Sequence, residues 1–306
     1  MTDLATYELV AASALLVAGF AYAAISDLRD REVADGLWQG LGIAGFLLGF
    51  LVVLPGGVVP AVLWAVVGLF VLQHLFSWDT LLGTEGERYA DIVELTVYVV
   101  TIAVVLVALA RVGLGAQGVP LPVVAVLVSV LFARGLFEAG ILFGGADAKA
   151  LMIAGLLVPM FPNPLIPQPA SIAAITSIVP FAVTVLINSA LFSVVIPIAI
   201  AVRNLRAGEF HHLSAFVGYS IPVEELPHRY VWVHDPMFGE AREEEQTIET
   251  SEDDRRRREK LAEELTAKGV SRVWVTPQIP FVVVMLFGVL GGMLVGNVLF
   301  DVLSRL

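Results

Sequence analysis

Two short stretches of the sequence place an aspartate beside a long apolar run. Asp27 follows the run that ends near Ile25, and Asp147 precedes the run that begins at Ala148. Two carboxylates held within a few ångströms of each other share one proton, because they do not both ionise readily. Such a pair can hydrolyse an amide, since the ionised carboxylate takes a proton from water while the protonated one donates to the carbonyl oxygen. The two stretches therefore predict an acid–base pair, provided that the fold brings them to one place.

Small residues precede the second aspartate. Gly144, Gly145 and Ala146 lead directly to Asp147, and a residue without a Cβ lets an extended substrate backbone come close to a carboxylate. The local sequence also permits plainer interpretations. Asp147 could be the N-cap of the helix that follows, and Asp27 could be a solvated charge in a loop. The residues alone leave these alternatives open.

The elements that must hold the two aspartates are apolar. Hydrophobic residues make up 58% of the 306 residues and charged residues 15%, whereas a soluble domain carries about 25% charge. A helix needs about 20 apolar residues to cross the ~30 Å hydrocarbon core of a bilayer. Runs of roughly this kind predict eight membrane spans, at residues 8–26, 37–54, 58–77, 93–111, 120–142, 148–161, 173–201 and 279–303.

The predicted fold class is an all-α polytopic membrane protein with about eight transmembrane helices. Residues 1–201 form the predicted membrane domain with both aspartates, and 279–306 form a C-terminal transmembrane helix. Between them lies the polar segment 202–278, predicted to be a small cytoplasmic α+β or partly disordered domain. Its first half has short aromatic and β-branched runs typical of strands, and its second half is highly charged.

Basic residues follow the first and the seventh predicted span, at Arg29, Arg31, Arg203 and Arg206. Short loops rich in arginine and lysine face the cytoplasm, which predicts that both loops lie on that side of the plasma membrane. Six predicted spans separate these two loops, and four separate the first loop from the glycine-containing stretch before Asp147. Both numbers are even, so this stretch is predicted to face the cytoplasm as well.

Composition also narrows the chemistry. The chain has no cysteine, which excludes disulfides, cysteine-ligated metals and a thiol nucleophile. The histidines are irregularly spaced, so we predict no metal site, and nothing in the sequence calls for a cofactor. A net charge of −11 argues against nucleic acid as a partner.

At the two aspartates the chain resembles the archaeal type IV prepilin peptidase and preflagellin (prearchaellin) peptidase family, membrane aspartic peptidases of the Gly-x-Gly-Asp class. Asp27, trailed by Arg31 and Val33, is similar to the family motif that follows the first membrane helix. The string from Gly144 to Lys149 is similar to the second motif, Gly-x-Gly-Asp-x-Lys. In this chain Ala146 stands where the motif has its second glycine.

The resemblance implies an aspartic endopeptidase with Asp27 and Asp147 as the catalytic pair. Residues Gly144, Gly145, Ala146, Lys149 and Arg31 would surround the approach of the substrate. It also implies pilin or archaellin precursors as partners, cleaved at the cytoplasmic membrane face without a cofactor. The alternative from another class is a membrane transporter or an assembly scaffold that uses the carboxylates without catalysis.

The acidic, lysine-poor composition predicts adaptation to high salt, because salt screens repulsion between like charges. The only lysines are Lys149, Lys260 and Lys268. We expect the chain to lose helical circular dichroism in detergent when salt is lowered and to regain it when salt is restored. An unchanged spectrum at low salt would contradict this expectation.

Overall fold

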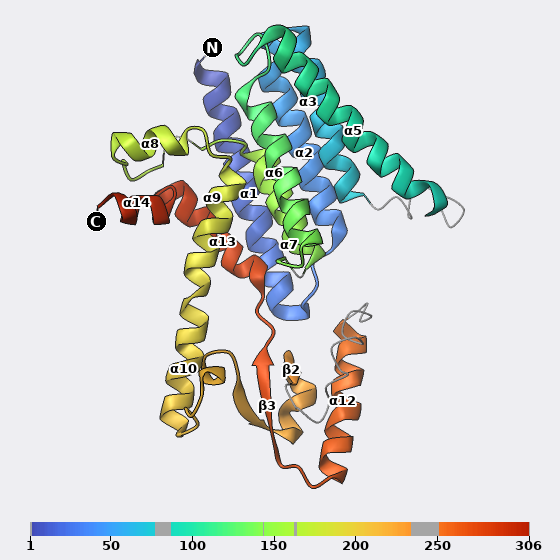
Figure 1. Ribbon diagram of the computed structural model, residues 1–306, viewed down its shortest axis with the longest axis vertical. Helices are drawn as coiled ribbons and strands as arrows, with labels where there is room; N and C mark the ends of the chain where they lie inside the picture. The colour runs from blue at the N-terminus through green and yellow to red at the C-terminus, as the bar shows by residue number, and fades with distance from the viewer. Residues whose placement is uncertain (1, 77–86, 143, 162–163, 234–250, 306) are drawn as a thin grey trace. The chain divides into compact units, whose positions relative to one another are not determined.

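The computed structural model describes residues 2–76, 87–142, 144–161, 164–233 and 251–305. Helices dominate this part of the chain (Figure 1). They are α1 (Thr2–Asp30), α2 (Asp35–Val53), α3 (Val58–Leu75), α5 (Glu87–Val112), α6 (Leu121–Glu138), α7 (Gly145–Leu157), α8 (Ala170–Thr176), α9 (Phe181–Ser193), α10 (Val195–Ala207), α12 (Ser251–Ala267), α13 (Phe281–Leu294) and α14 (Val298–Ser304). Short strands β1 (Tyr219–Pro222), β2 (Val231–Val233) and β3 (Arg272–Pro277) come before the last helices. The predicted fold class, helical with a small sheet in the polar segment, is confirmed.

The chain divides into two compact units. The first comprises residues 1–25, 33–191 and 281–306, and the second comprises 26–32 and 192–280. The second unit thus begins inside the run that the sequence assigns to the membrane domain. It also takes in Ser26–Glu32, the segment that carries Asp27.

Six helical segments are long and apolar enough to cross a membrane. They are Glu8–Asp30, Asp35–Gly56, Val58–Leu75, Ile92–Val112, Leu121–Glu138 and Phe181–Ala207. A further candidate is the pair α13 and α14, which bends by 51° at a short break. Length and composition therefore support up to seven spans among the described residues, one fewer than the eight predicted.

The difference in number comes from α7, which the apolar run predicts as the span 148–161. This helix has 13 residues and is about 20 Å long at 1.5 Å per residue, too short for the hydrocarbon core. It is buried almost throughout, at Ala148 and from Ala150 to Leu157, and it packs against α2 and α6. A helix that is apolar on every side is enclosed by other helices, and periodicity alone does not separate this case from a membrane span.

Glycines on α2 permit the close packing that encloses α7. Gly42, Gly45 and Gly49 are all buried, and a Cβ at Gly45 would lie 3.1 Å from Leu156 of α7. A Cβ at Gly49 would overlap the indole ring of Trp64 in α3. Association of helices in lipid depends on such close contact, because lipid tails are as apolar as the side chains.

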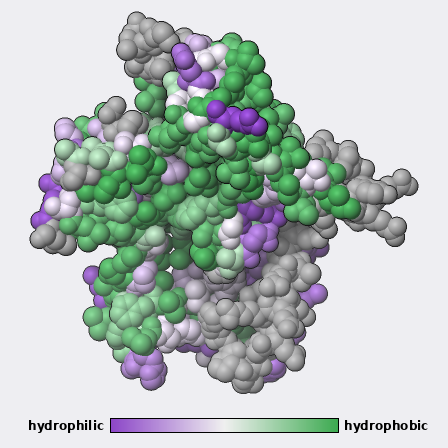
Figure 2. Space-filling model, turned by 45° about the horizontal axis from the view of Figure 1, so that its top comes forward, coloured by the Kyte–Doolittle hydropathy of each residue, from purple (hydrophilic) through white to green (hydrophobic). Residues whose placement is uncertain are grey.

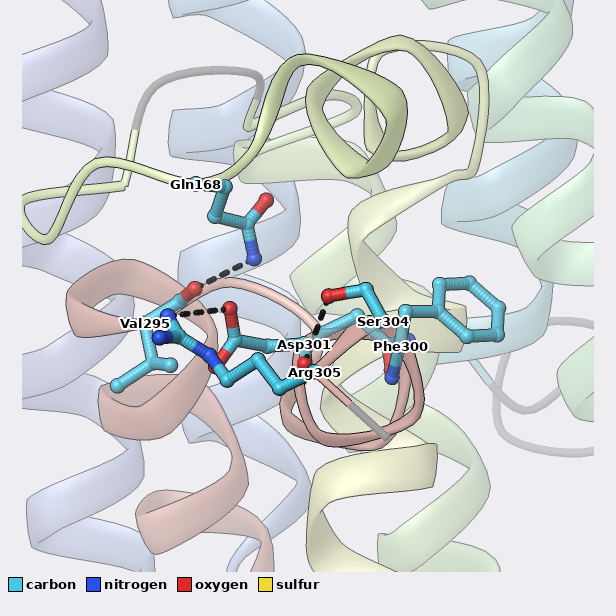
Figure 3. Close-up of polar contacts among 7 residues, drawn as sticks. Gln168, Val295, Phe300, Asp301, Ser304 and Arg305 are labelled. Atoms are coloured by element: carbon cyan, nitrogen blue, oxygen red, sulfur yellow. Dashed lines mark hydrogen bonds and ion pairs between the residues drawn. The ribbon is translucent and has the colours of Figure 1, made fainter.

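The break between α13 and α14 leaves backbone groups that neighbouring polar side chains satisfy (Figure 3). The Gln168 side-chain amide donates to the Val295 carbonyl over 2.6 Å. Asn188, which is fully buried in the span Phe181–Ala207, donates to the Gly296 carbonyl and accepts from the Val298 amide, both over 2.9 Å. Unpaired backbone groups are costly in hydrocarbon, so these contacts explain an asparagine in an apolar helix.

Many large apolar side chains of the first unit are exposed. Leu47, Leu51, Leu69 and Leu95 have between 56% and 65% of their surface accessible, and Figure 2 shows apolar surface over much of the face that it presents. Soluble monomers rarely expose apolar patches of this extent. The first unit therefore has the surface of a protein embedded in lipid.

The second unit contains a small antiparallel sheet in the order β1-β3-β2. Tyr219 pairs with Val275 on one side of β3, and Val231 pairs with Pro277 on the other. Val273–Val275, which lie shortly before the last predicted span, are therefore part of the central strand. Residues 251–267 of the charged half form helix α12, and residues 234–250 lie outside the described residues.

Gly49→Ala tests the close packing of α2. We expect it to lower stability by about 1–3 kcal/mol, because the added methyl meets a buried, rigid indole. Gly40→Ala on the same helix is the matched control, since no atom lies within 4 Å of its Cβ position. Thermal unfolding in detergent measures both variants. Equal melting temperatures for the two would contradict the packing described for α2.

Candidate active site

Asp27 lies in the last turn of α1, not in a loop. The buried residues Leu16, Phe20 and Ala23 precede it at helical spacing, so Asp27 continues the same face of the helix. Phe20 packs edge-on against Trp38 of α2, with 6.0 Å between ring centroids. The side chain of Asp27 is half-buried. The interpretation of Asp27 as a solvated loop charge is therefore wrong.

Helix α1 ends at a residue with an unusual backbone conformation. Arg31 has φ 59°, and it is the single non-glycine residue with positive φ among the described residues. Its amide donates to the Asp27 carbonyl over 3.2 Å, which closes the helix as glycine does at many C-termini. The Ser26 hydroxyl donates to the Glu32 carbonyl over 2.7 Å. Together these bonds define the backbone around Asp27.

The side chain of Arg31 lies against an aromatic residue that directly precedes β2. Its guanidinium carbon is 5.0 Å from the centroid of the Tyr230 ring, within the range of a cation–π contact. Burial lowers the pKa of Arg31 from its ordinary value, and the negative charge of Asp27 opposes this shift.

Asp147 lies in the first turn of α7, three residues after the N-cap, which is Gly144. The N-cap interpretation of Asp147 is therefore wrong, and Gly144 makes no side-chain capping bond. A negative charge in the first turn is favourable by about 0.3–1 kcal/mol, because the amide ends of the helix dipole point toward it. Asp147 is half-buried at the start of a helix whose remaining turns are enclosed. The packing of α7 thus determines where this carboxylate lies.

The glycines before Asp147 differ in what they permit. A Cβ at Gly144 would lie 2.9 Å from Oδ2 of Asp147, so the carboxylate occupies the space that a side chain would need. Gly145 has open space at the same position. Ala146 has no positive φ and is an ordinary helical residue, so the alanine at the motif's second glycine introduces no backbone strain.

Lys149 pairs with a residue that the sequence does not single out. Its ammonium nitrogen lies 2.5 Å from Oδ1 of Asp35, the first residue of α2. The pair links the N-terminal ends of α2 and α7. It contributes about 1 kcal/mol or less, because Asp35 is 52% exposed. No local signal identifies Asp35, since the two residues are far apart in sequence and an acidic residue opening a helix is common.

The predicted site residues therefore fall into two groups. Gly144, Gly145, Ala146, Asp147 and Lys149 belong to the first unit, and Asp27 and Arg31 belong to the second. In each group, neighbouring residues contact the aspartate: Gly144 leaves space for the Asp147 carboxylate, and Arg31 bonds to the Asp27 backbone and places a positive charge near its side chain. Tyr230 joins the second group and is likewise not predicted from the sequence, because its role depends on a contact between residues about 200 positions apart.

The apolar helices, the lipid-type surface and the half-buried carboxylates at helix ends define a multi-pass membrane protein. Residues 211–298 match the family model described as archaeal peptidase A24 C-terminus, type II. Comparison with curated proteins and with solved structures gives no match. This region is therefore similar to the C-terminal part of archaeal A24 peptidases, in agreement with the resemblance that the two aspartate motifs carry.

Gly144→Ala tests whether Gly144 makes room for the Asp147 carboxylate. The added methyl has to displace that carboxylate, and we expect peptidase activity to fall on the order of 10- to 100-fold, as small misplacements of reacting groups do. The measurement is the rate of cleavage of a pilin-type precursor, the substrate class that the resemblance implies.

Gly145→Ala is the matched control for this variant, because its Cβ meets no atom within 4 Å. It should cleave at close to the rate of the unmodified chain. If both variants retained full activity, the space at Gly144 would have no role in placing the carboxylate.

Proposed function

We propose that this protein is a membrane aspartic endopeptidase that removes the short basic leader of pilin or archaellin precursors. The match of residues 211–298 to the archaeal A24 peptidase C-terminus carries the proposal. The two aspartates and the Gly144–Lys149 motif support the aspartic mechanism, since the chain has no cysteine that could act as a nucleophile.

In the proposed mechanism Asp27 and Asp147 act as one pair that shares a proton. The ionised carboxylate removes a proton from a water molecule, whose oxygen attacks the scissile carbonyl carbon. The protonated carboxyl donates its proton to the carbonyl oxygen, which gives a neutral tetrahedral diol. Collapse of the diol breaks the C–N bond, and the carboxyl that gained a proton from water transfers it to the leaving amine. One diol hydroxyl gives its proton to the other carboxylate as the product carbonyl forms, which restores the starting pair.

The surroundings of each aspartate suit one part of this mechanism. The first turn of α7 and the absence of a Cβ at Gly144 leave the Asp147 carboxylate room beside the helix start. Arg31 supplies positive charge near Asp27. The arginines Arg29 and Arg31 after the first span support a cytoplasmic position for the reaction, where a precursor's leader precedes its apolar helix.

The test is cleavage of a co-expressed pilin or archaellin precursor by variants of the two aspartates, with leader removal read by mass spectrometry. Asp27→Asn and Asp147→Asn should each lower the rate on the order of 10³-fold or more. The double variant should be no slower than either single variant, because groups that act as a unit are not additive.

Asp30→Asn is the matched control. Asp30 lies in the same turn of α1 as Asp27, is 59% exposed and pairs only loosely with Arg29, at 3.7 Å. It should leave cleavage unchanged. Full activity in either Asp27→Asn or Asp147→Asn would remove the pair from the mechanism, and an uncleaved precursor with the unmodified chain would contradict the proposed function itself.

A further inference from the structure

An aromatic residue of the second unit, Tyr230, contacts the segment that carries Asp27. We call Ser26–Glu32 the Asp27 segment. Tyr230 contacts it twice: its ring receives the Arg31 guanidinium at 5.0 Å, and its hydroxyl donates to the Arg29 carbonyl over 3.4 Å. The contacted residues lie on either side of Asp30: Arg29 belongs to the last turn of α1, which also contains Asp27, and Arg31 directly follows that turn.

Tyr230 is itself held in place without the Asp27 segment. The Gln278 amide donates to the Tyr230 carbonyl over 3.0 Å, and the Arg258 guanidinium lies 5.3 Å from the ring centroid. Arg258 is 5% exposed and pairs with Asp254 one turn earlier in α12, and Asp254 also accepts from the Gln278 side chain over 3.3 Å. The ring is therefore a fixed platform, supported from α12 and from the residue that follows β3.

The backbone of Arg31 indicates what this platform does. A non-glycine residue with φ near +60° costs on the order of 1 kcal/mol and persists where surrounding contacts enforce it. In this conformation the Arg31 amide closes the last turn of α1 on the Asp27 carbonyl, while its side chain reaches Tyr230. Backbone closure and stacking thus depend on the same residue, and both act on the turn that presents Asp27.

We propose that Tyr230 is a positioning residue that holds the Asp27 segment in the conformation needed for cleavage. The expected effect on cleavage rests on the proposed function. The expected effect on the conformation of the Asp27 segment does not. It gives the polar unit a specific role, because the region that matches the A24 C-terminus then orders the turn that carries the first aspartate. Tyr230 contacts the segment beside Asp27 and takes no part in bond making.

The structural consequence is measured on the full-length chain in detergent by a nitroxide at Leu28→Cys. The chain has no other cysteine, and Leu28 is 55% exposed, so the label attaches at one site without being buried. Tyr230→Leu removes the ring, and we expect the electron paramagnetic resonance spectrum to change from restrained to mobile. Tyr230→Phe keeps the ring and loses only the long hydroxyl contact, so it should keep the restrained spectrum.

Tyr219→Leu is the matched control, because Tyr219 in β1 also has an arginine over its ring. That arginine is Arg203 of α10, at 3.7 Å, and not a residue of the Asp27 segment. Loss of this stack perturbs the same unit, but the label at Leu28→Cys should stay restrained. A label mobilised equally by both substitutions would show general loosening of the unit and would overturn the inference.

The catalytic consequence is measured on the unlabelled variants with a co-expressed pilin precursor and, for rates, the purified precursor. Tyr230→Leu should lower kcat roughly tenfold or more with KM little changed, since it misplaces a reacting group without removing substrate contacts. Tyr230→Phe should restore most of the rate. An unmodified chain that does not cleave would contradict the proposed function. In that case the spectrum of the nitroxide at Leu28→Cys still tests whether Tyr230 holds the Asp27 segment. A label that remains restrained in Tyr230→Leu would overturn the inference whatever the rates are.

Discussion

The enclosure of α7 is the constraint on which the first unit depends. This helix is too short to cross a bilayer and apolar on every side, so it is stable only where other helices surround it. The glycines of α2 allow the approach that this requires, and on the α6 side Gly155 lies where a Cβ would overlap Ser129. Because the helix is packed along its length, its first turn has little freedom, and Asp147 lies in that turn. The scaffold thereby orients a carboxylate at a helix start without relying on a loop.

Polar side chains within the apolar unit hydrogen-bond to backbone groups that would otherwise be unpaired in hydrocarbon, where water cannot satisfy them. At the break between α13 and α14 the carbonyls of Val295 and Gly296 each receive a side-chain amide, from Gln168 and Asn188 respectively. On α3 and α5 the His74 ring and the Tyr98 hydroxyl share a hydrogen bond of 2.6 Å. These residues appear in the sequence as isolated polar interruptions, but each pairs with a distant partner. Their presence is therefore explained by packing.

The second unit is a different kind of structure, with a small core and many charges. Ile221, Leu226, Leu265 and Val275 are nearly inaccessible and join the sheet, the turn after β1 and α12 into one core. Around this core, arginines stack on tyrosines at Tyr219 and Tyr230. In such a contact the arginine side chain covers the apolar face of the ring, and the ring attracts its positive charge. This kind of packing suits an acidic unit with few large apolar residues. The inclusion of Ser26–Glu32 in this unit makes the end of α1 part of the polar domain's structure.

The sequence by itself determined the helical membrane class, the two aspartates beside apolar runs and the presence of a small sheet, because composition, run length and alternation are local properties. It did not separate α7 from a membrane span, since a buried helix and a lipid-facing helix are equally apolar. It also left Asp147 as a possible N-cap, because the start of a helix depends on which backbone groups are already paired. Only the tertiary structure decided that the Asp147 carboxylate takes up the space beside Gly144, that Lys149 pairs with Asp35, and that Tyr230 supports the turn after Asp27. Each of these is a contact between side chains that chain folding brings together, and its energy depends on distances that no local pattern encodes.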